Sequence, residues 1–258
     1  VKDEAGSDDA HFDEPQRLAV DGSDRLYVVD RNNNRVQRCT FSGGSWTCAA
    51  FDSGLNYPNG IAIRGDNVYI ADTYNGRIRR CSVASGACSD FVTDTYGIYD
   101  VAVDSSGNVY GSAAWEGIVA EFDSGGNLQG AFLGVEGVPY LTDGYHYNHP
   151  RVAIDNSNNI IIVEENGQRL LKLNSSDVPQ WTVGVPGVDT NSDNDHFNWP
   201  HGVATDNSGN IYVADGCRVQ IFNSNGVHSA TLGGPDCGNG TYEFDWATGI
   251  AVDNNNGN

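Results

Sequence analysis

The sequence contains no methionine, no run of about 18 apolar residues and few basic side chains. Without such a run, no membrane-spanning helix is expected. Only 14 of the 258 residues are Lys or Arg, against 34 Asp and Glu, and the formal net charge is −20. That charge would repel a phosphate backbone, so nucleic acid is not an expected partner. Because the chain lacks methionine and begins at Val1, we expect it to be a segment of a longer polypeptide.

Six cysteines form three pairs that are close in sequence, and no C-x-x-C spacing occurs. Although six cysteines permit many connectivities, local pairing is the simplest prediction. Disulfides indicate an oxidising compartment, so a secreted or extracellular protein is expected. Two sequons, at Asn174 and Asn239, fit a glycoprotein of this kind. The predicted disulfides are Cys39 with Cys48, Cys81 with Cys88, and Cys217 with Cys237.

Three short phrases recur along the whole chain. In the first copy they are Phe12–Asp21, Leu26–Asp30 and Asn34–Arg38. The second and fifth copies match well, the third and fourth are weaker, and a sixth copy at Trp246–Asp253 has only the first phrase. The positions aligned with Pro15 are 15, 58, 98, 150, 200 and 247, which predicts one four-stranded unit for each period.

Each phrase has a physical role in such a unit. Stretches 104–108 and 206–210 combine Asp, Gly and Asn and predict hairpin turns. The second phrase ends in an acid, and an Arg follows five residues later in three copies. We expect these acids and arginines to pair across a hairpin as structural ion pairs: Asp30 with Arg35, Asp72 with Arg77 and Glu164 with Arg169.

The phrases Pro-x-x-Leu-Ala-Val-Asp, Leu-Tyr-Val-Val-Asp and Asn-Arg-Val of the first copy resemble the NHL repeat. The resemblance implies an all-β fold, a six-bladed β-propeller of NHL-type repeats whose sixth blade is incomplete in this chain. Residues 1–258 would form a single propeller domain. Its blades are expected to start near residues 12, 55, 95, 147, 197 and 243.

The sixth copy is expected to contribute one inner strand, and the other strands of that blade are missing. A lone inner strand would leave exposed edges. Either further residues of the same polypeptide or a neighbouring chain would supply the remaining strands, so self-assembly is one expectation.

The NHL resemblance also implies a ligand-binding face, where the residue after each Pro position lines the mouth of a central channel. This ring is polar and irregular, and it could bind a small polar ligand or a peptide end, or be a wet lining with no function. The candidate binding residues are Gln16, Asn59, Tyr99, Asp100, Arg151, His201 and Thr248.

The sequence offers two candidate metal sites. The peptidyl-alpha-hydroxyglycine lyase propeller, a distant relative by resemblance, holds zinc with three histidines, but only His201 occupies an equivalent position here. No catalytic residue is therefore assigned. Asp189, Asn191, Asp193 and Asp195 alternate like the start of a calcium loop, without the later Gly and Glu of an EF-hand. No cofactor is expected to be required, and calcium is a weaker alternative to a solvated loop.

These features favour an extracellular binding or scaffold module, not an enzyme, whose propeller face or edge binds protein or glycan within an extracellular assembly. The alternative is a metal-assisted lyase or hydrolase with its site at the channel mouth. Bound metal with a His or Asp shell would favour the alternative.

Overall fold

The computed structural model describes residues 5–93, 95, 97–113, 117–133, 149–185, 193–234, 237–238, 240 and 243–252. The chain divides into two compact units, which are described separately. The first comprises residues 1–113 and 121–129, and the second comprises residues 114–120 and 130–258. Among the described residues, no helix combines the length and the hydrophobicity needed to cross a bilayer.

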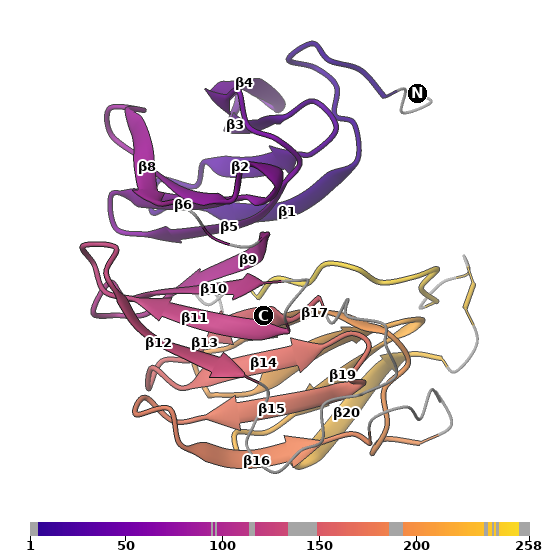
Figure 1. Ribbon diagram of the computed structural model, residues 1–258. Coiled ribbons are helices and arrows are strands. Elements are labelled where there is room, and N and C mark those ends of the chain that lie inside the picture. The colour runs from indigo at the N-terminus through magenta and orange to yellow at the C-terminus, as the bar shows by residue number, and fades with distance from the viewer. Residues whose placement is uncertain are drawn as a thin grey trace. The chain divides into compact units, whose positions relative to one another are not determined.

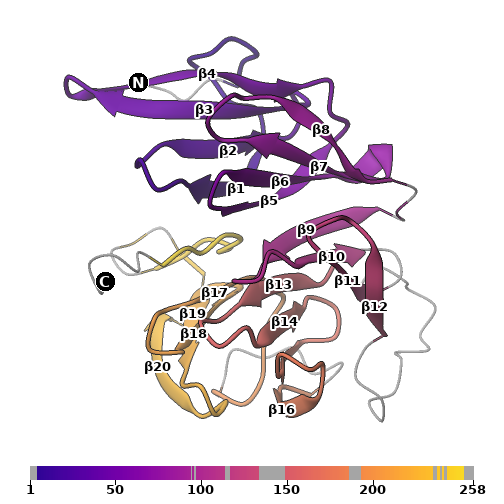
Figure 2. The same ribbon diagram turned by 90° about the vertical axis from the view of Figure 1, so that its left-hand side faces the viewer.

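The described residues form an all-β propeller fold of five four-stranded blades (Figure 1). Within each blade the strands pair in chain order, as Figure 2 shows for β1 to β4. Blade one consists of β1 (Pro15–Val20), β2 (Leu26–Asp30), β3 (Arg35–Ser42) and β4 (Ser45–Ser53). Blade two consists of β5 (Pro58–Arg64), β6 (Asn67–Asp72), β7 (Arg77–Ser82) and β8 (Cys88–Val92), with the 3₁₀ turn η1 (Thr73–Asn75) after β6.

The other three blades have the same order. Blade three consists of β9 (Ile98–Val103), β10 (Val109–Ala113), β11 (Ile118–Phe122) and β12 (Leu128–Leu133). Blade four consists of β13 (Arg151–Ile154), β14 (Ile160–Glu164), β15 (Arg169–Leu173) and β16 (Pro179–Val183). Blade five consists of β17 (Pro200–Thr205), β18 (Ile211–Asp215), β19 (Arg218–Phe222) and β20 (His228–Gly233).

The sixth copy is where the expected architecture was wrong. The part of the chain that the structure describes forms five blades, and residues 245–252 contain no strand, while Asp253 lies outside the described residues. The segment still lies beside β17, because a Cβ added at Gly202 would be 3.0 Å from the carbonyl oxygen of Thr248. An inner strand is defined by its ladder to a second strand, and residues 245–252, the described part of this copy, pair with no such strand.

The three predicted pairs between the acid that ends the second phrase and the Arg that opens the third are all present. The acceptors Asp30 and Asp72 take hydrogen bonds from Arg35 Nε at 2.7 Å and from Arg77 Nε at 2.6 Å. Glu164 accepts from Arg169 in blade four. Blade five has a fourth pair at the shorter spacing of three, in which Arg218 Nε donates to Asp215 Oδ2 over 2.8 Å. These pairs are structural, since each joins two neighbouring strands.

All six cysteines are paired in the predicted way, Cys39 with Cys48, Cys81 with Cys88 and Cys217 with Cys237. The first two disulfides join directly opposed residues of the third and fourth strands of their blades. The predicted turns are also present: Asp104 and Asp206 each accept backbone N–H groups two and four residues later.

Asp155, in the turn between β13 and β14 of blade four, should make the stability of the fold depend on pH. Burial acts to raise the pKa of Asp155, but hydrogen bonds from Asn159, buried Lys172 and the Ser157 amide outweigh it and lower that pKa below its ordinary value. A carboxyl with a lowered pKa stabilises the fold above its unfolded pKa, near pH 4, and this contribution is lost as the pH falls through the folded pKa.

We therefore expect the midpoint of urea unfolding to fall between pH 5 and pH 3. The fall should be smaller in Asp155→Asn, which has no carboxyl to protonate at this position. Urea titrations of both proteins across this range measure the difference, and identical pH profiles would contradict the role of Asp155.

Candidate functional site

One corner of the backbone recurs at the start of every copy. The residue just before the Pro position has a positive φ in all six copies, including the copy without strands. Five of the six are not glycine, and for such residues a positive φ is conformationally unfavourable. Proteins often tolerate this strain at ligand sites. The corner residues are Glu14, Tyr57, Gly97, His149, Trp199 and Trp246.

In the second unit, the start of blade four, the end of β14 and the start of blade five bring a carboxylate and two imidazoles together. Glu165 follows β14 directly. Its Oε2 lies 3.3 Å from Nδ1 of the corner residue His149, and its Oε1 lies 3.5 Å from Nε2 of His201 on β17. The Glu165 side chain is only 12% exposed, so its charge is screened mainly by these neighbours.

The His201 ring is held in one orientation. Its Nδ1 lies 2.6 Å from the carbonyl oxygen of Trp199, and since a carbonyl can only accept, Nδ1 carries the proton. The other nitrogen, Nε2, is thereby directed at Glu165. The ring also meets the edge of Trp246 with a centroid distance of 5.6 Å. Both ring nitrogens therefore face oxygen acceptors, and these contacts orient the ring.

The carboxylate of Glu165 is ionised at neutral pH. Burial acts to raise its pKa, but the hydrogen bond from His149 and the charges of His201, His149 and Arg151 outweigh this and bring the pKa below its ordinary value. Arg151 is buried at the start of β13, and its Nε donates to the carbonyl oxygen of His201 over 3.1 Å. The site therefore combines a strong acceptor, two imidazoles and a guanidinium.

Two indole side chains lie at the corners next to this group. Trp199 is 37% exposed and Trp246 is 47% exposed. Aromatic surface beside a few fixed polar groups is typical of ligand sites. The arrangement can bind a polar ligand that offers both hydroxyl groups and an apolar ring face.

The structure places three of the seven predicted residues in this unit. Arg151 and His201 are brought together by a hydrogen bond. Thr248 is exposed, and its carbonyl lies near Gly202. That any of the three binds a ligand stays a prediction.

The other four predicted residues lie in the first unit. Buried Asp100 pairs with Arg17, whose Nη2 donates over 2.8 Å. Buried Asn59 donates through Nδ2 to Thr73 Oγ1 over 2.8 Å. Gln16 and Tyr99 are half-buried at the inner strands. In this unit too, a ligand-binding role stays a prediction.

Sequence reasoning missed Glu165, His149 and Trp246. His149 was not selected as a site residue, and Glu165 was overlooked because its neighbour Glu164 fills the structural acid position. The sequence did indicate Glu165, since it is a second acid directly after Glu164, the last residue of the second phrase in the fourth copy. The corner positions carried no signal, because a positive φ at a non-glycine residue cannot be read from composition.

The structure describes two of the four predicted calcium ligands, Asp193 and Asp195. Asp189 and Asn191 lie outside the described residues, as does Asn239 of the second sequon. The Asp193 carboxylate accepts the Asp195 amide and lies 2.8 Å from His196 Nδ1. The equivalent pair near the N-terminus, Asp8 with His11, has the same contact at 2.6 Å. Asp195 is exposed, and calcium at this loop stays a prediction.

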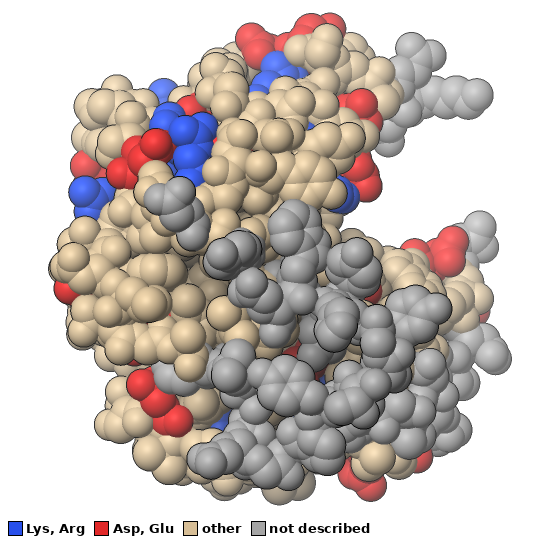
Figure 3. All heavy atoms as spheres, viewed as in Figure 1, with Lys and Arg blue, Asp and Glu red and all other residues tan. Residues whose placement is uncertain are grey.

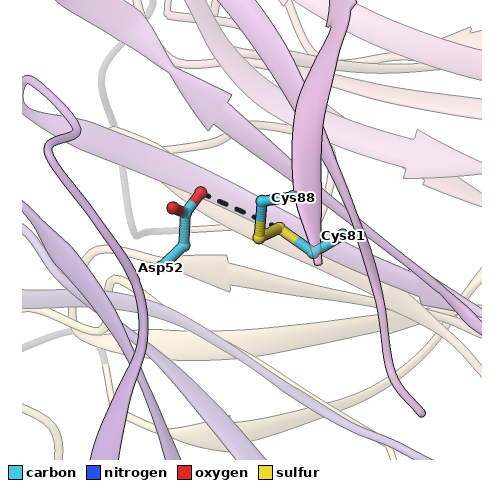
Figure 4. A group of neighbouring side chains, drawn as sticks. All are labelled: Asp52, Cys81 and Cys88. Carbon is cyan, nitrogen blue, oxygen red and sulfur yellow. Dashed lines mark hydrogen bonds between the residues drawn. A yellow bond between two sulfur atoms is a disulfide. The ribbon is translucent and has the colours of Figure 1, made fainter. Parts of the chain in front are cut away.

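Another group has the composition of a metal site but not its chemistry. Asp52, Cys81 and Cys88 have potential ligand atoms within 4.8 Å of one another (Figure 4). Both sulfurs belong to one disulfide, so neither is the thiolate that a metal requires. The Asp52 carboxylate instead accepts from Arg79 at 3.0 and 3.2 Å. This cluster is therefore structural.

Comparison with solved structures gives the same fold at low sequence identity. An auxiliary nutrient binding protein from Bacteroides ovatus matches with a TM-score of 0.70 and 16% identity, over 94% of this chain and 65% of the other. Inactive virginiamycin B lyase from Staphylococcus aureus, solved with quinupristin, matches with a TM-score of 0.67 and 13% identity, over 93% and 74%. A nidogen/laminin complex matches with a TM-score of 0.62 and 14% identity, over 85% and 79%.

The sequence matches no curated protein. The family model for the NHL repeat matches residues 12–39, 55–81 and 197–222. These are the first, second and fifth copies, the three with the most complete phrases. Together with the propeller fold, the three matches support the predicted resemblance to NHL-repeat β-propellers.

Proposed function

We propose that this protein is an extracellular binding module whose site on the second unit takes a neutral glycan. The observation that carries the proposal is the ionised Glu165 between two imidazoles, with the exposed rings of Trp199 and Trp246 at the adjoining corners. A carboxylate accepts hydrogen bonds from sugar hydroxyls, and an indole face covers the apolar side of a sugar ring.

The charge of the second unit supports a neutral ligand over an anionic one. This unit contains only four basic residues, and all of them are buried: Arg151, Arg169, Lys172 and Arg218. On the face shown in Figure 3, basic side chains gather over the first unit, among acidic ones. A sulfated or phosphorylated ligand would meet no exposed cation on the second unit, so its charge would be unfavourable there.

An extracellular location rests on separate observations. Three disulfides are typical of an oxidising compartment. The sequon residue Asn174 lies half-buried in the turn between β15 and β16, and the sequon residues that follow it, Ser175 and Ser176, are exposed. The similar folds of a nutrient binding protein and of the nidogen/laminin complex support a binding role, with a protein partner as the other candidate.

A lyase or hydrolase is the second candidate. His149, Glu165 and His201 are residue types that act as general acids and bases or bind zinc, although each imidazole faces a different oxygen of Glu165. The fold is also similar to that of virginiamycin B lyase. An enzyme would turn over its ligand, whereas a binding module would release it unchanged, so product analysis by mass spectrometry separates the two.

Screening a neutral glycan array, followed by calorimetry on the ligands found, tests the proposal. Glu165→Gln keeps the shape of the side chain but removes its charge, and we expect it to weaken binding at least about tenfold, equivalent to about 1.4 kcal/mol. The matched control is Glu243→Gln, at an exposed acid of the same unit. If no neutral glycan binds, or if Glu165→Gln binds as tightly as the parent, the proposal is wrong.

A further inference from the structure

Two tyrosine rings and an ion pair lie together where blade one meets blade two, within the first unit. The ring of Tyr57, the corner residue of blade two, stacks on that of Tyr74 in η1, with a centroid distance of 5.0 Å and an interplanar angle of 28°. The Arg31 guanidinium lies over the Tyr57 ring, 5.3 Å from its centroid. Arg31 Nη1 also donates to Oε1 of Glu14 over 3.2 Å. These four residues define the Arg31 site.

The Arg31 site occupies the same repeat positions as the group around Glu165. Arg31 follows β2 directly, as Glu165 follows β14. Each of them contacts the corner residue of its own blade. Arg31 contacts Glu14 at 3.2 Å, and Glu165 contacts His149 at 3.3 Å. The fold therefore places a charged side chain and a polar corner residue together in the same way in both units.

Both junctions also have an aromatic residue at the corner of the following blade, Tyr57 in the first unit and Trp199 in the second. The residue after the second strand is Thr73 in blade two and Gly216 in blade five, and neither is charged. Among the described residues at these positions, a charged group next to an aromatic corner therefore occurs at the two junctions that begin in blades one and four.

Backbone hydrogen bonds hold the rings of the Arg31 site in place. The Tyr57 amide donates to Asn34 Oδ1 over 2.9 Å, and the Tyr74 amide donates to the carbonyl oxygen of Asn56 over 3.0 Å. The corner residues Glu14 and Tyr57 have positive φ values of 51° and 46°. Because the backbone is already ordered, a ligand that packs on these rings would lose little affinity to ordering the protein.

The Arg31 site also has hydrogen-bonding capacity that the protein leaves unused. Arg31 Nε is enclosed and has no hydrogen-bond partner. In the part of the chain that the structure describes, Arg31 Nη2 and Glu14 Oε2 make no hydrogen bond either. The Glu14 side chain is 48% exposed and Tyr74 is 54% exposed. A donor, an acceptor and an aromatic ring are therefore accessible side by side.

We propose that the Arg31 site is a second site for a neutral sugar. Its ligand class rests on the proposed function, because it shares its repeat positions with the Glu165 group. Arg31 Nη2 would donate to one sugar hydroxyl, and Glu14 would accept from the neighbouring hydroxyl. The ring of Tyr74 would cover the apolar face of the sugar.

The local charges favour a neutral ligand over a charged one. The Arg31 charge is already balanced by Glu14. A further carboxylate, that of Asp13, lies beside them and accepts from Asn32 Nδ2 over 3.1 Å. A sugar acid would add another negative charge to this group, and an amino sugar would bring a cation to the guanidinium. A neutral sugar avoids both repulsions.

Calorimetry with neutral hexasaccharides of glucose, mannose, xylose or galactose tests the proposal on residues 1–258. In the Glu165→Gln background, we expect Tyr74→Ala to weaken the remaining binding at least about tenfold, since the sugar loses the ring surface on which it packs. Tyr74→Phe keeps that surface and should bind like its parent. The matched control is Phe41→Ala, at another aromatic residue of the first unit, which is 56% exposed.

Hydroxyl-radical footprinting of the Glu165→Gln protein provides a measurement without substitutions in the Arg31 site. Modification of Tyr57 and Tyr74 should fall when the bound hexasaccharide is added, and modification of Phe41 should not change. Unchanged modification of both tyrosines would overturn the proposal.

The two sites can fail separately. Sugar binding that Glu165→Gln weakens and Tyr74→Ala leaves unchanged would overturn the Arg31 site and leave the proposed function standing. Binding that Tyr74→Ala weakens and Glu165→Gln leaves unchanged would support the Arg31 site and overturn the proposed function. If a hexasaccharide of galacturonic acid binds at Tyr74 and the neutral hexasaccharides do not, the neutral ligand class is wrong.

Discussion

Replacing Asp215 with asparagine is expected to lower the free energy of unfolding by about 3–5 kcal/mol, as when one partner of a buried ion pair is removed. Both side chains of the pair are buried, with Asp215 0% and Arg218 3% exposed. The carboxylate also accepts from the Asn198 amide at 2.5 Å and from Gln220 at 2.9 Å. The substitution therefore leaves a buried guanidinium without its counter-charge.

Urea unfolding of Asp215→Asn and of the control Asp195→Asn measures this effect. Asp195 is exposed, so the same chemical change there should leave the unfolding midpoint where it is. The double variant Asp215→Leu with Arg218→Met should cost less than the two single changes together, because it removes both charges. Equal midpoints for the two asparagine variants would show that the pair does not stabilise blade five.

Replacing Gly60 with alanine is expected to cost about 3 kcal/mol, at the upper end of what overpacking a core costs. A Cβ at this position would lie 2.7 Å from Asp100 Cα and 2.9 Å from the Val101 nitrogen. Both are backbone atoms of β9, which is held in the ladder of blade three. The new methyl group would also press on Asp100, the partner of Arg17, so inner strands of two blades would have to separate.

The matched control is Gly22→Ala, since a Cβ at Gly22 would meet no heavy atom within 4 Å. That variant should be as stable as the parent, or slightly more stable because its unfolded chain is less flexible. Thermal melts of the two alanine variants compare the same added group in a crowded and in an open position. If Gly60→Ala and Gly22→Ala have the same melting temperature, β9 can move away at little cost and the close approach is not required.

Local chemistry explains which parts of the fold could be predicted. The phrases, the turn residues and the acid-to-Arg spacing are each read within a few residues of chain, and in the five copies that form blades they led to the correct strands, turns and ion pairs. The third copy, with Ala113 and Ile118 in place of acid and Arg, still forms a blade, because Val109, Tyr110 and Val119 are buried. Apolar packing replaces the ion pair there.

The sixth blade shows where local reasoning failed. The copy at Trp246 keeps the left-handed corner of the repeat and the position beside Gly202, but it forms no strand. The corner is a property of a few residues, whereas a strand requires hydrogen bonds to a second segment. A matching phrase was therefore sufficient to predict the path of the chain and insufficient to predict a sheet.

The candidate site was only half predictable for a related reason. Arg151 and His201 were found because they share one repeat position, while Glu165 and His149 occupy different positions in the copy. Glu165 meets His201 because β14 of blade four ends beside β17 of blade five. The Cys217–Cys237 disulfide, by contrast, was predicted from proximity in sequence alone.

The sequence by itself determined the repeat, the blades, the disulfide pairing and the acidic character, since these depend on residue types at short spacing. Only the tertiary structure decided that Glu165 lies between His149 and His201 and that all four basic residues of the second unit are buried. Contacts between neighbouring blades depend on how the blades stack against one another, and that stacking is set by the packing of whole faces.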